Sequence, residues 1–196
     1  MINPSLRPGR LAVVPVLLAA LLAAALPAAA SLRQGTVEFL IGRNRVDEPR
    51  FAAVYKNNGP VVGVSFSGNL ALNLNLYLDI KYMSRTGTLT YTKEKSTLSF
   101  LPISGGVRYI HPFKVVHPYV GVGTDVYFYY EENPIDTVVN AARGTHLLAG
   151  AYVQPLESVP LALNVRIKWT SAKTTEQERT INLGGLEYGL TVAFLF

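Results

Sequence analysis

The sequence predicts an all-β chain, an eight-stranded antiparallel up-and-down transmembrane β-barrel preceded by a cleaved signal peptide. Three observations predict this fold. The first thirty residues have the layout of a secretory signal. The remainder alternates between apolar and polar residues with a period of two, which is the pattern of β-strands. The connections between the alternating segments are short and long in turn, which is typical of barrels that cross a membrane.

The N-terminal segment predicts export. Two arginines precede an apolar run that begins at Leu11, and Ala28-Ala29-Ala30 closes the run. A basic region, an apolar region and an A-x-A site together favour a signal peptide over residues 1–30, ahead of a barrel domain over residues 31–196. The alternative is an N-terminal transmembrane helix, since the apolar run is just long enough to span a bilayer. Small alanines at its end and the absence of a following basic cluster favour cleavage.

Composition excludes several classes of site. The chain contains no cysteine, which excludes disulfides, thiolate metal sites and a cysteine nucleophile. The formal net charge of +5 falls to +3 once Arg7 and Arg10 are removed with the signal peptide. No basic helix and no alternation of aromatic and basic residues accompanies this charge, so nucleic-acid binding is not expected. The sequence predicts neither a metal nor an organic cofactor.

Eight segments carry the strand pattern, and most have the length of a tilted strand that crosses a bilayer. They are residues 34–42, 61–69, 73–84, 97–109, 118–129, 144–153, 161–171 and 183–196. The connections after the second, fourth and sixth segments are short. The other four are polar and are expected near residues 43–60, 85–96, 130–143 and 172–182. With an even number of strands, both ends of the barrel domain lie on the short-turn side, the periplasm.

The polar face of the strands indicates which solvent surrounds the barrel. In segment 161–171, Leu163 and Val165 alternate with Asn164 and Arg166. Across all segments the polar face is rich in Gly, Ser, Thr, Asn and Ala, which suit the crowded lumen of a narrow barrel. A water-exposed surface would carry far more Lys and Glu. We therefore expect the polar face to line the lumen and the apolar face to contact lipid.

Charged residues on the predicted inner face are balanced in sign. Because an unpaired buried charge costs several kcal/mol, a balanced set favours a lumen filled by paired side chains. A chance balance among eight residues is the alternative. The four acids are Glu38, Asp79, Asp125 and Glu187, and the four bases are Lys81, Arg108, Arg166 and Lys168.

Aromatic residues are expected in belts at the two membrane boundaries. Tyr82, Phe128 and Trp169 lie near the long-connection ends of their segments, and Tyr109 and Phe113 lie near the short-turn ends. Ordinary enrichment of aromatic residues in strands explains the same positions without a belt.

The end of the chain resembles the terminal strand of bacterial outer-membrane proteins. Its alternating apolar residues are Tyr188, Leu190, Val192, Phe194 and Phe196. Residues 98–109, 117–123 and 144–150 also resemble the small eight-stranded outer-membrane β-barrel domain family, the OmpA/OmpX/OmpW-like group. The resemblance implies a location in the bacterial outer membrane and recognition of the last strand by the barrel assembly machinery. It implies no activity, because that architecture serves many roles.

The leading functional expectation is a non-enzymatic structural or interaction barrel whose long connections face outside. A narrow pore for small solutes or ions is the main alternative, and a soluble periplasmic barrel is another. A lipid-modifying enzyme is less favoured, because the set Ser171, His146 and Asp136 follows no motif. His111 and His117 flank a proline-containing turn, which accounts for them without a metal.

The expected partners are membrane lipids and, during biogenesis, the barrel assembly machinery. Lysines and arginines of the long connections could also pair with lipopolysaccharide phosphates, but solvated loops of mixed charge are the favoured interpretation. The barrel is expected to be a monomer.

Overall fold

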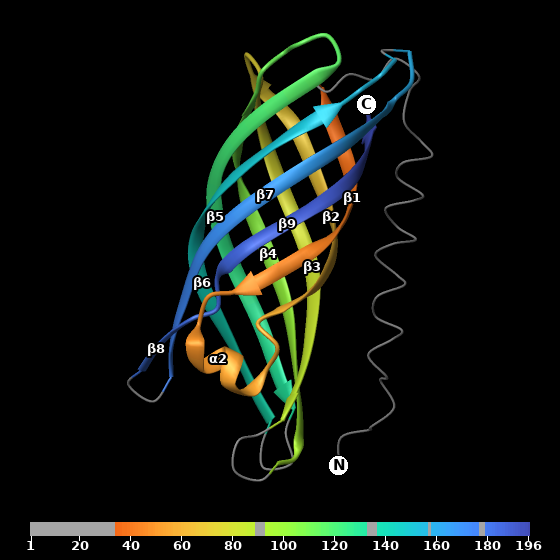
Figure 1. Ribbon diagram of the computed structural model, residues 1–196. Coiled ribbons are helices and arrows are strands. Elements are labelled where there is room, and N and C mark those ends of the chain that lie inside the picture. The colour runs from red at the N-terminus through yellow and green to blue at the C-terminus, as the bar shows by residue number, and fades with distance from the viewer. Residues whose placement is uncertain (1–33, 89–92, 133–136, 157, 177–178) are drawn as a thin grey trace, which may run out of the picture.

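The computed structural model describes residues 34–88, 93–132, 137–156, 158–176 and 179–196, so the predicted signal peptide lies outside the described residues. Long tilted strands surround a central axis (Figure 1). The strands are β1 (Gly35–Val46), β2 (Asn58–Ala71), β3 (Leu74–Thr88), β4 (Lys95–Ile110), β5 (Val116–Glu132), β6 (Thr137–Val153), β7 (Leu161–Glu176), β8 (Arg179–Asn182) and β9 (Gly185–Leu195). A short helix, α2 (Pro49–Val54), lies between β1 and β2.

The strands form one closed antiparallel barrel. Each long strand pairs with its neighbours in sequence, and the pairing of β1 with β9 closes the sheet. β8 pairs with the outer end of β7 and β9 pairs with the rest of it, so the two form a single last strand that Leu183 and Gly184 interrupt. The predicted eight-stranded up-and-down architecture is therefore confirmed.

The register sets the width of the barrel. Following paired residues once round the barrel from Arg143 leads back to β6 at Val153, a stagger of ten residues. With about 3.3 Å per residue and about 4.8 Å between strands, this stagger implies a tilt of about 40° and a backbone radius of about 8 Å. A barrel this narrow has room inside for side chains alone.

The two faces of the wall are the reverse of those of a soluble barrel. On β7, Val165 and Leu163 are 57% and 60% exposed, whereas their neighbours Asn164 and Arg166 are 1% and 2% exposed. The same alternation of exposed apolar and buried polar residues runs along β3 and β5. The prediction that the polar face lines the lumen is confirmed by this burial.

The short turns lie at one end of the barrel, with the C-terminus (Figure 1). Leu72 and Asn73 connect β2 to β3, and both have positive φ angles, 41° and 71°. Two consecutive residues with positive φ form a type I′ turn, whose twist matches that of a hairpin.

The prediction of four long loops is partly wrong. β3 and β4 remain paired as far as Thr88 and Lys95, and β5 and β6 as far as Glu132 and Thr137. Much of the polar sequence near 85–96 and 130–143 is therefore strand. These hairpin extensions satisfy their own backbone hydrogen bonds, so they need no apolar alternation to continue the ladder.

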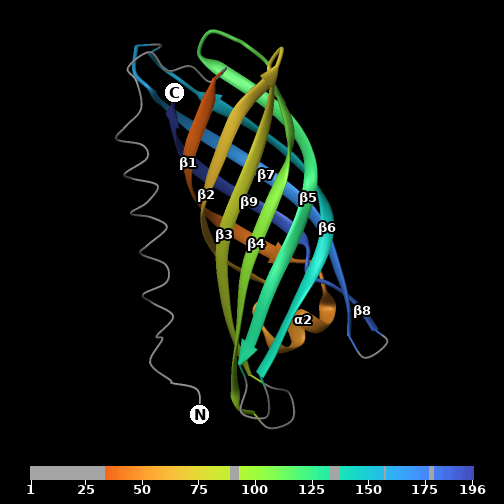
Figure 2. The ribbon, with the colours of Figure 1, turned by 180° about the vertical axis from the view of Figure 1, so that it is seen from behind.

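The connection predicted near 43–60 contains α2, which lies across the barrel end opposite the short turns (Figure 2). Pro49 begins the helix, a position where its missing N–H has no helical partner to lose. Phe51 in α2 and Tyr55 just after it are buried, and the ring centroids of Phe51 and Phe100 of β4 are 6.1 Å apart. Within the described ranges, no helix is both long enough and apolar enough to cross a bilayer.

Candidate functional site

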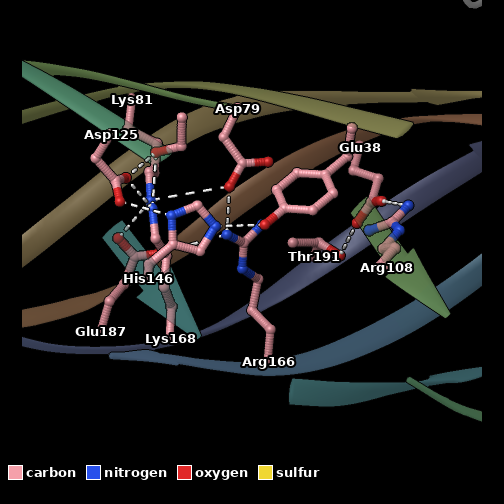
Figure 3. A network of polar contacts seen from close by, with 12 residues as sticks. Glu38, Asp79, Lys81, Arg108, Asp125, His146, Arg166, Lys168, Glu187 and Thr191 are labelled. Atoms are coloured by element: carbon pink, nitrogen blue, oxygen red, sulfur yellow. Dashed lines mark hydrogen bonds and ion pairs between the residues drawn. The ribbon is translucent and has the colours of Figure 1, made fainter. Parts of the chain in front are cut away.

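The lumen contains all eight charged residues that the sequence placed on the inner face. Each is at most 2% exposed, although the eight come from six different strands. The structure brings them together in two groups (Figure 3). One group surrounds Glu38 and Arg108, and the other contains the remaining six charges.

Glu38 is the centre of the first group, and both of its carboxylate oxygens are occupied. Oε1 accepts hydrogen bonds from Arg108 Nη2 at 3.0 Å and from the Tyr152 hydroxyl at 2.5 Å. Oε2 accepts hydrogen bonds from Asn164 at 3.0 Å and from Thr191 at 2.9 Å. A single cation thus balances Glu38, and neutral donors complete its hydrogen bonding.

Three tyrosine rings surround the guanidinium of Arg108. Its central carbon lies 5.7 Å from the ring centroid of Tyr77, 5.3 Å from that of Tyr119 and 5.2 Å from that of Tyr152. At these distances the rings attract the cation electrostatically. Arg108 also donates to the Ser67 hydroxyl at 2.8 Å. This cage fills the lumen toward the short-turn end.

The second group begins with four alternating charges. Lys81 Nζ is 2.7 Å from a Glu187 oxygen and 3.9 Å from an Asp79 oxygen. Arg166 donates a hydrogen bond to Asp79 and lies 3.6 Å from the other Glu187 oxygen. Each charge in this set therefore has two oppositely charged neighbours.

Asp125 joins the second group to a histidine. Lys168 Nζ is 2.5 Å from Asp125 Oδ1, and the Ser104 hydroxyl donates to the same oxygen. His146 Nδ1 is 2.6 Å from Asp125 Oδ2, and its Nε2 forms a hydrogen bond with the Tyr77 hydroxyl. A chain of hydrogen bonds thus runs from Lys168 through Asp125 and His146 to Tyr77.

Apolar layers close the lumen on both sides of the charges. The outer layer is built from α2 and the outer ends of the strands, and it includes Phe51, Met83, Phe100, Tyr127 and Tyr129. The layer at the short-turn end includes Ile110, Tyr119, Leu148, Tyr152 and Leu195. Most of the charges therefore lie between two clusters of buried apolar residues, and Arg108 lies among the tyrosines of the inner one.

Hydrogen bonds of Tyr55 hold the end of α2 at the outer opening of the barrel. The Tyr55 hydroxyl donates to Glu131 at 2.7 Å and forms a hydrogen bond with the Ser96 hydroxyl at 2.6 Å. Burial raises the pKa of Tyr55, so this phenol stays protonated and keeps its proton for the hydrogen bond. Tyr55, which directly follows α2, is thereby anchored to β4 and β5.

The set Ser171, His146 and Asp136 does not form a catalytic site in the described structure. Ser171 lies on the exterior face of β7. It follows Val165, Ile167 and Trp169 at the same two-residue spacing, and these three side chains point outward. His146 is buried in the lumen, and Asp136 lies outside the described residues. His146 lies well within β6, which continues outward from it to Thr137.

The sequence did not single out several partners of the lumen charges. Tyr77 and Tyr119 share the parity of the inner charges on β3 and β5, which was the available signal. His146 and Tyr152 lie on β6, which contributes no charge to the lumen within the described residues, so no charged neighbour marked their face. Among the residues that the structure describes, no group of three or more potential metal ligands occurs.

The predicted belt and terminal-strand residues lie on the exterior. Tyr82, Tyr109, Phe128 and Trp169 are exposed on the outer face of the wall, and Phe113 is exposed in the connection between β4 and β5. On β9, Tyr188, Leu190 and Val192 are exposed, while Phe194 packs edge-on against Phe39 with ring centroids 6.0 Å apart. The backbone N–H of Phe196 donates to Gly35 O at 3.2 Å, so the last residue is bound to the first strand.

Comparison with known proteins identifies the architecture through structure alone. No model of a protein family and no curated protein matches the sequence. Neisserial surface protein A is 11% identical with a TM-score of 0.62, covering 83% of this chain and 97% of its own. OprG from Pseudomonas aeruginosa is 10% identical with a TM-score of 0.62, covering 84% and 98%.

A third solved structure, outer membrane protein W of E. coli, is 13% identical with a TM-score of 0.54, and the match covers 85% of this chain and 100% of that one. At sequence identities this low, the structural similarity shows a shared fold only. The chain has the fold of the small eight-stranded outer-membrane β-barrels, as the OmpA/OmpX/OmpW-like resemblance of its sequence predicted.

Proposed function

We propose that this protein is an integral outer-membrane barrel with a structural or interaction role, whose lumen does not conduct. Its long connections and hairpin extensions face outside, and its exposed apolar wall contacts lipid. The single observation that carries the proposal is the filled lumen, in which two apolar layers enclose eight buried charges.

The filled lumen argues against a pore. A conducting pathway would have to pass the Phe51 and Phe100 rings at the outer end and the Arg108–tyrosine cage at the other. The charges between them are balanced and engaged with one another, so they present no single-sign surface to select passing ions. A role carried out on the exterior surfaces is the reading that this interior supports.

An enzymatic role has less support, because the one candidate set in the sequence is divided between the two faces of the wall. The hydrogen-bonded chain of Asp125, His146 and Tyr77 is buried within the barrel, away from the lipid and the outer connections. Neighbouring buried groups satisfy its members, which is consistent with a structural role.

Conductance in planar lipid bilayers tests the proposal. We expect the purified full chain to insert without producing stable current steps. The variant Phe51→Ala/Phe100→Ala, which removes rings from the outer layer, should raise the frequency of brief openings. Ala52→Ser, at an exposed position of α2, is the matched control. Steady wild-type currents that lumen substitutions such as Lys168→Met abolish would establish a pore instead.

Extraction separates a membrane barrel from a soluble periplasmic one. We expect release of the protein by detergent and not by osmotic shock, together with faster gel migration before boiling than after it. Release by osmotic shock would contradict the membrane assignment.

A further inference from the structure

Two cations face each other on the exterior of β6 and β7. Arg143 lies directly opposite Lys173 in the antiparallel register, and both side chains are exposed. In the described part of the chain, neither makes an ion pair or a side-chain hydrogen bond. Like charges directly opposite each other destabilise a strand pair. An anion bound between the two would relieve that repulsion.

Among the described residues, the strand partners that flank the cation pair are uncharged, although the Glu48 carboxylate accepts a hydrogen bond from the backbone N–H of Asn182 at 3.3 Å. Val126 lies opposite Arg143 on β5, and Asn182 lies opposite Lys173 on β8. The next outward-facing pair toward the barrel centre is Thr145 and Ser171, which offers two hydroxyl donors. The site therefore combines two cations with neutral hydrogen-bonding groups.

Below the hydroxyls, the outward-facing residues of the same two strands are apolar. The next pairs are Leu147–Trp169 and Ala149–Ile167. They line a recess of about 580 Å³ in the exterior wall, which Val120 and Val122 of β5 also border. Ala149 has a shorter side chain than Val120 and Ile167, which lie on either side of it in the register.

The sequence of environments matches that of a phospholipid. From the outer end toward the middle of the wall, β6 and β7 present cations, then hydroxyls, then an apolar recess. Because the recess is continuous with the lipid-facing wall, an acyl chain can enter it from the bilayer. Arginine binds phosphate through two parallel hydrogen bonds, and lysine adds a compact charge.

We propose that this exterior strip binds a membrane lipid with an anionic phosphate headgroup, the phosphate between Arg143 and Lys173 and an acyl chain in the recess around Ala149. The site rests on the proposed membrane location, and it adds a headgroup preference that a uniform apolar wall would not have. It also gives one face of the barrel a fixed lipid contact beneath the outer hairpin extensions.

Trp169 provides the probe, since it is the only tryptophan of the chain and lines the recess. The full chain is reconstituted in phosphatidylcholine vesicles in which either phosphatidylcholine or phosphatidic acid carries brominated acyl chains, which quench tryptophan fluorescence on contact. We expect phosphatidic acid to bind at the site with an affinity at least about five-fold above that of phosphatidylcholine. This ratio is the increase in affinity that one cation near a membrane surface gives toward an anionic lipid. The preference should shrink in high salt.

Two variants and one control decide the outcome. Arg143→Gln/Lys173→Gln should reduce the preference to near unity, and Ala149→Phe should weaken quenching by both lipids. Lys95→Gln, an exposed cation on β4, should leave the preference unchanged. Equal wild-type quenching by the two brominated lipids would overturn the site while leaving the membrane barrel intact. No quenching by either lipid would instead contradict the proposed membrane location.

Discussion

Neighbouring residues of β7 lie on opposite faces of the strand, in opposite environments. Val165 is 57% exposed on the outside, and Arg166, one residue later, is 2% exposed inside between Asp79 and Glu187. In a soluble barrel the apolar residue would be inside and the cation outside. The protein therefore folds against two unlike media, lipid outside and its own polar side chains inside. Position in the alternation, more than residue type, then determines what a substitution costs.

The largest effect should come from removing an inner charge that has one partner. Arg108→Met leaves Glu38 buried with neutral donors alone, and breaking a buried pair in this way costs about 3–5 kcal/mol. Unfolding in guanidinium chloride from lipid vesicles, followed by Trp169 fluorescence, measures the loss. The double variant Arg108→Met/Glu38→Gln should recover part of it. A loss no larger than that of the exposed control Arg143→Met would remove the distinction between the faces.

Adding a charge to the outer face should have the next largest effect. Val165→Arg places a cation among lipid chains and should lower the free energy of unfolding by about 2–4 kcal/mol. Thr145→Arg, on the same face but nearer the outer boundary, should cost about 0–1 kcal/mol. The same unfolding assay compares the two. Equal costs at both positions would argue against a depth-dependent lipid contact.

Removing an inner charge that has two partners should cost less than removing Arg108. Glu187→Gln deprives Lys81 of its closest partner, but Lys81 retains Asp79 at 3.9 Å and Arg166 retains its bond to Asp79. We expect a loss of about 1.5–3 kcal/mol, the range for a hydrogen bond to a charged group. If Glu187→Gln lowers the free energy of unfolding as much as Arg108→Met does, the remaining ion pairs of the second group do not compensate for the lost one.

The smallest effect should come from an exposed ion pair at the outer end. Arg45 and Asp47 approach to 3.9 Å with both side chains largely exposed. Arg45→Gln should therefore change the free energy of unfolding by less than about 1 kcal/mol. A larger change would mean that the outer connection contributes to stability through contacts other than this pair.

Strand alternation made the barrel and its inner charges predictable. Glu38, Arg166 and Lys168 could be assigned to the lumen because parity on a strand places every second residue on one face. The partners of those charges could not be predicted. Arg166 reaches Asp79 across the barrel, and that meeting depends on the ten-residue stagger, which the sequence of one strand does not encode.

The outer end of the barrel was the least predictable part. Polar hairpin extensions such as residues 86–88 lack the apolar alternation that marks a strand facing lipid, so the sequence predicts loops there. The helix α2 is one and a half turns long, too short for a periodic signal, although Pro49 followed by Phe51 and Tyr55 is consistent with a helix start and one apolar face.

Site-directed spin labelling distinguishes a lumen filled by side chains from a water-filled one, and a chain without cysteine accepts single cysteines cleanly. Labels at Leu161, Leu163 and Val165 should collide readily with oxygen, which concentrates in lipid. Labels at Ala162, Asn164 and Thr170 should be shielded from both oxygen and a water-soluble nickel complex, since the lumen is filled. High accessibility of the inner positions to the nickel complex would instead show that water fills the lumen and that the two apolar clusters do not exclude it.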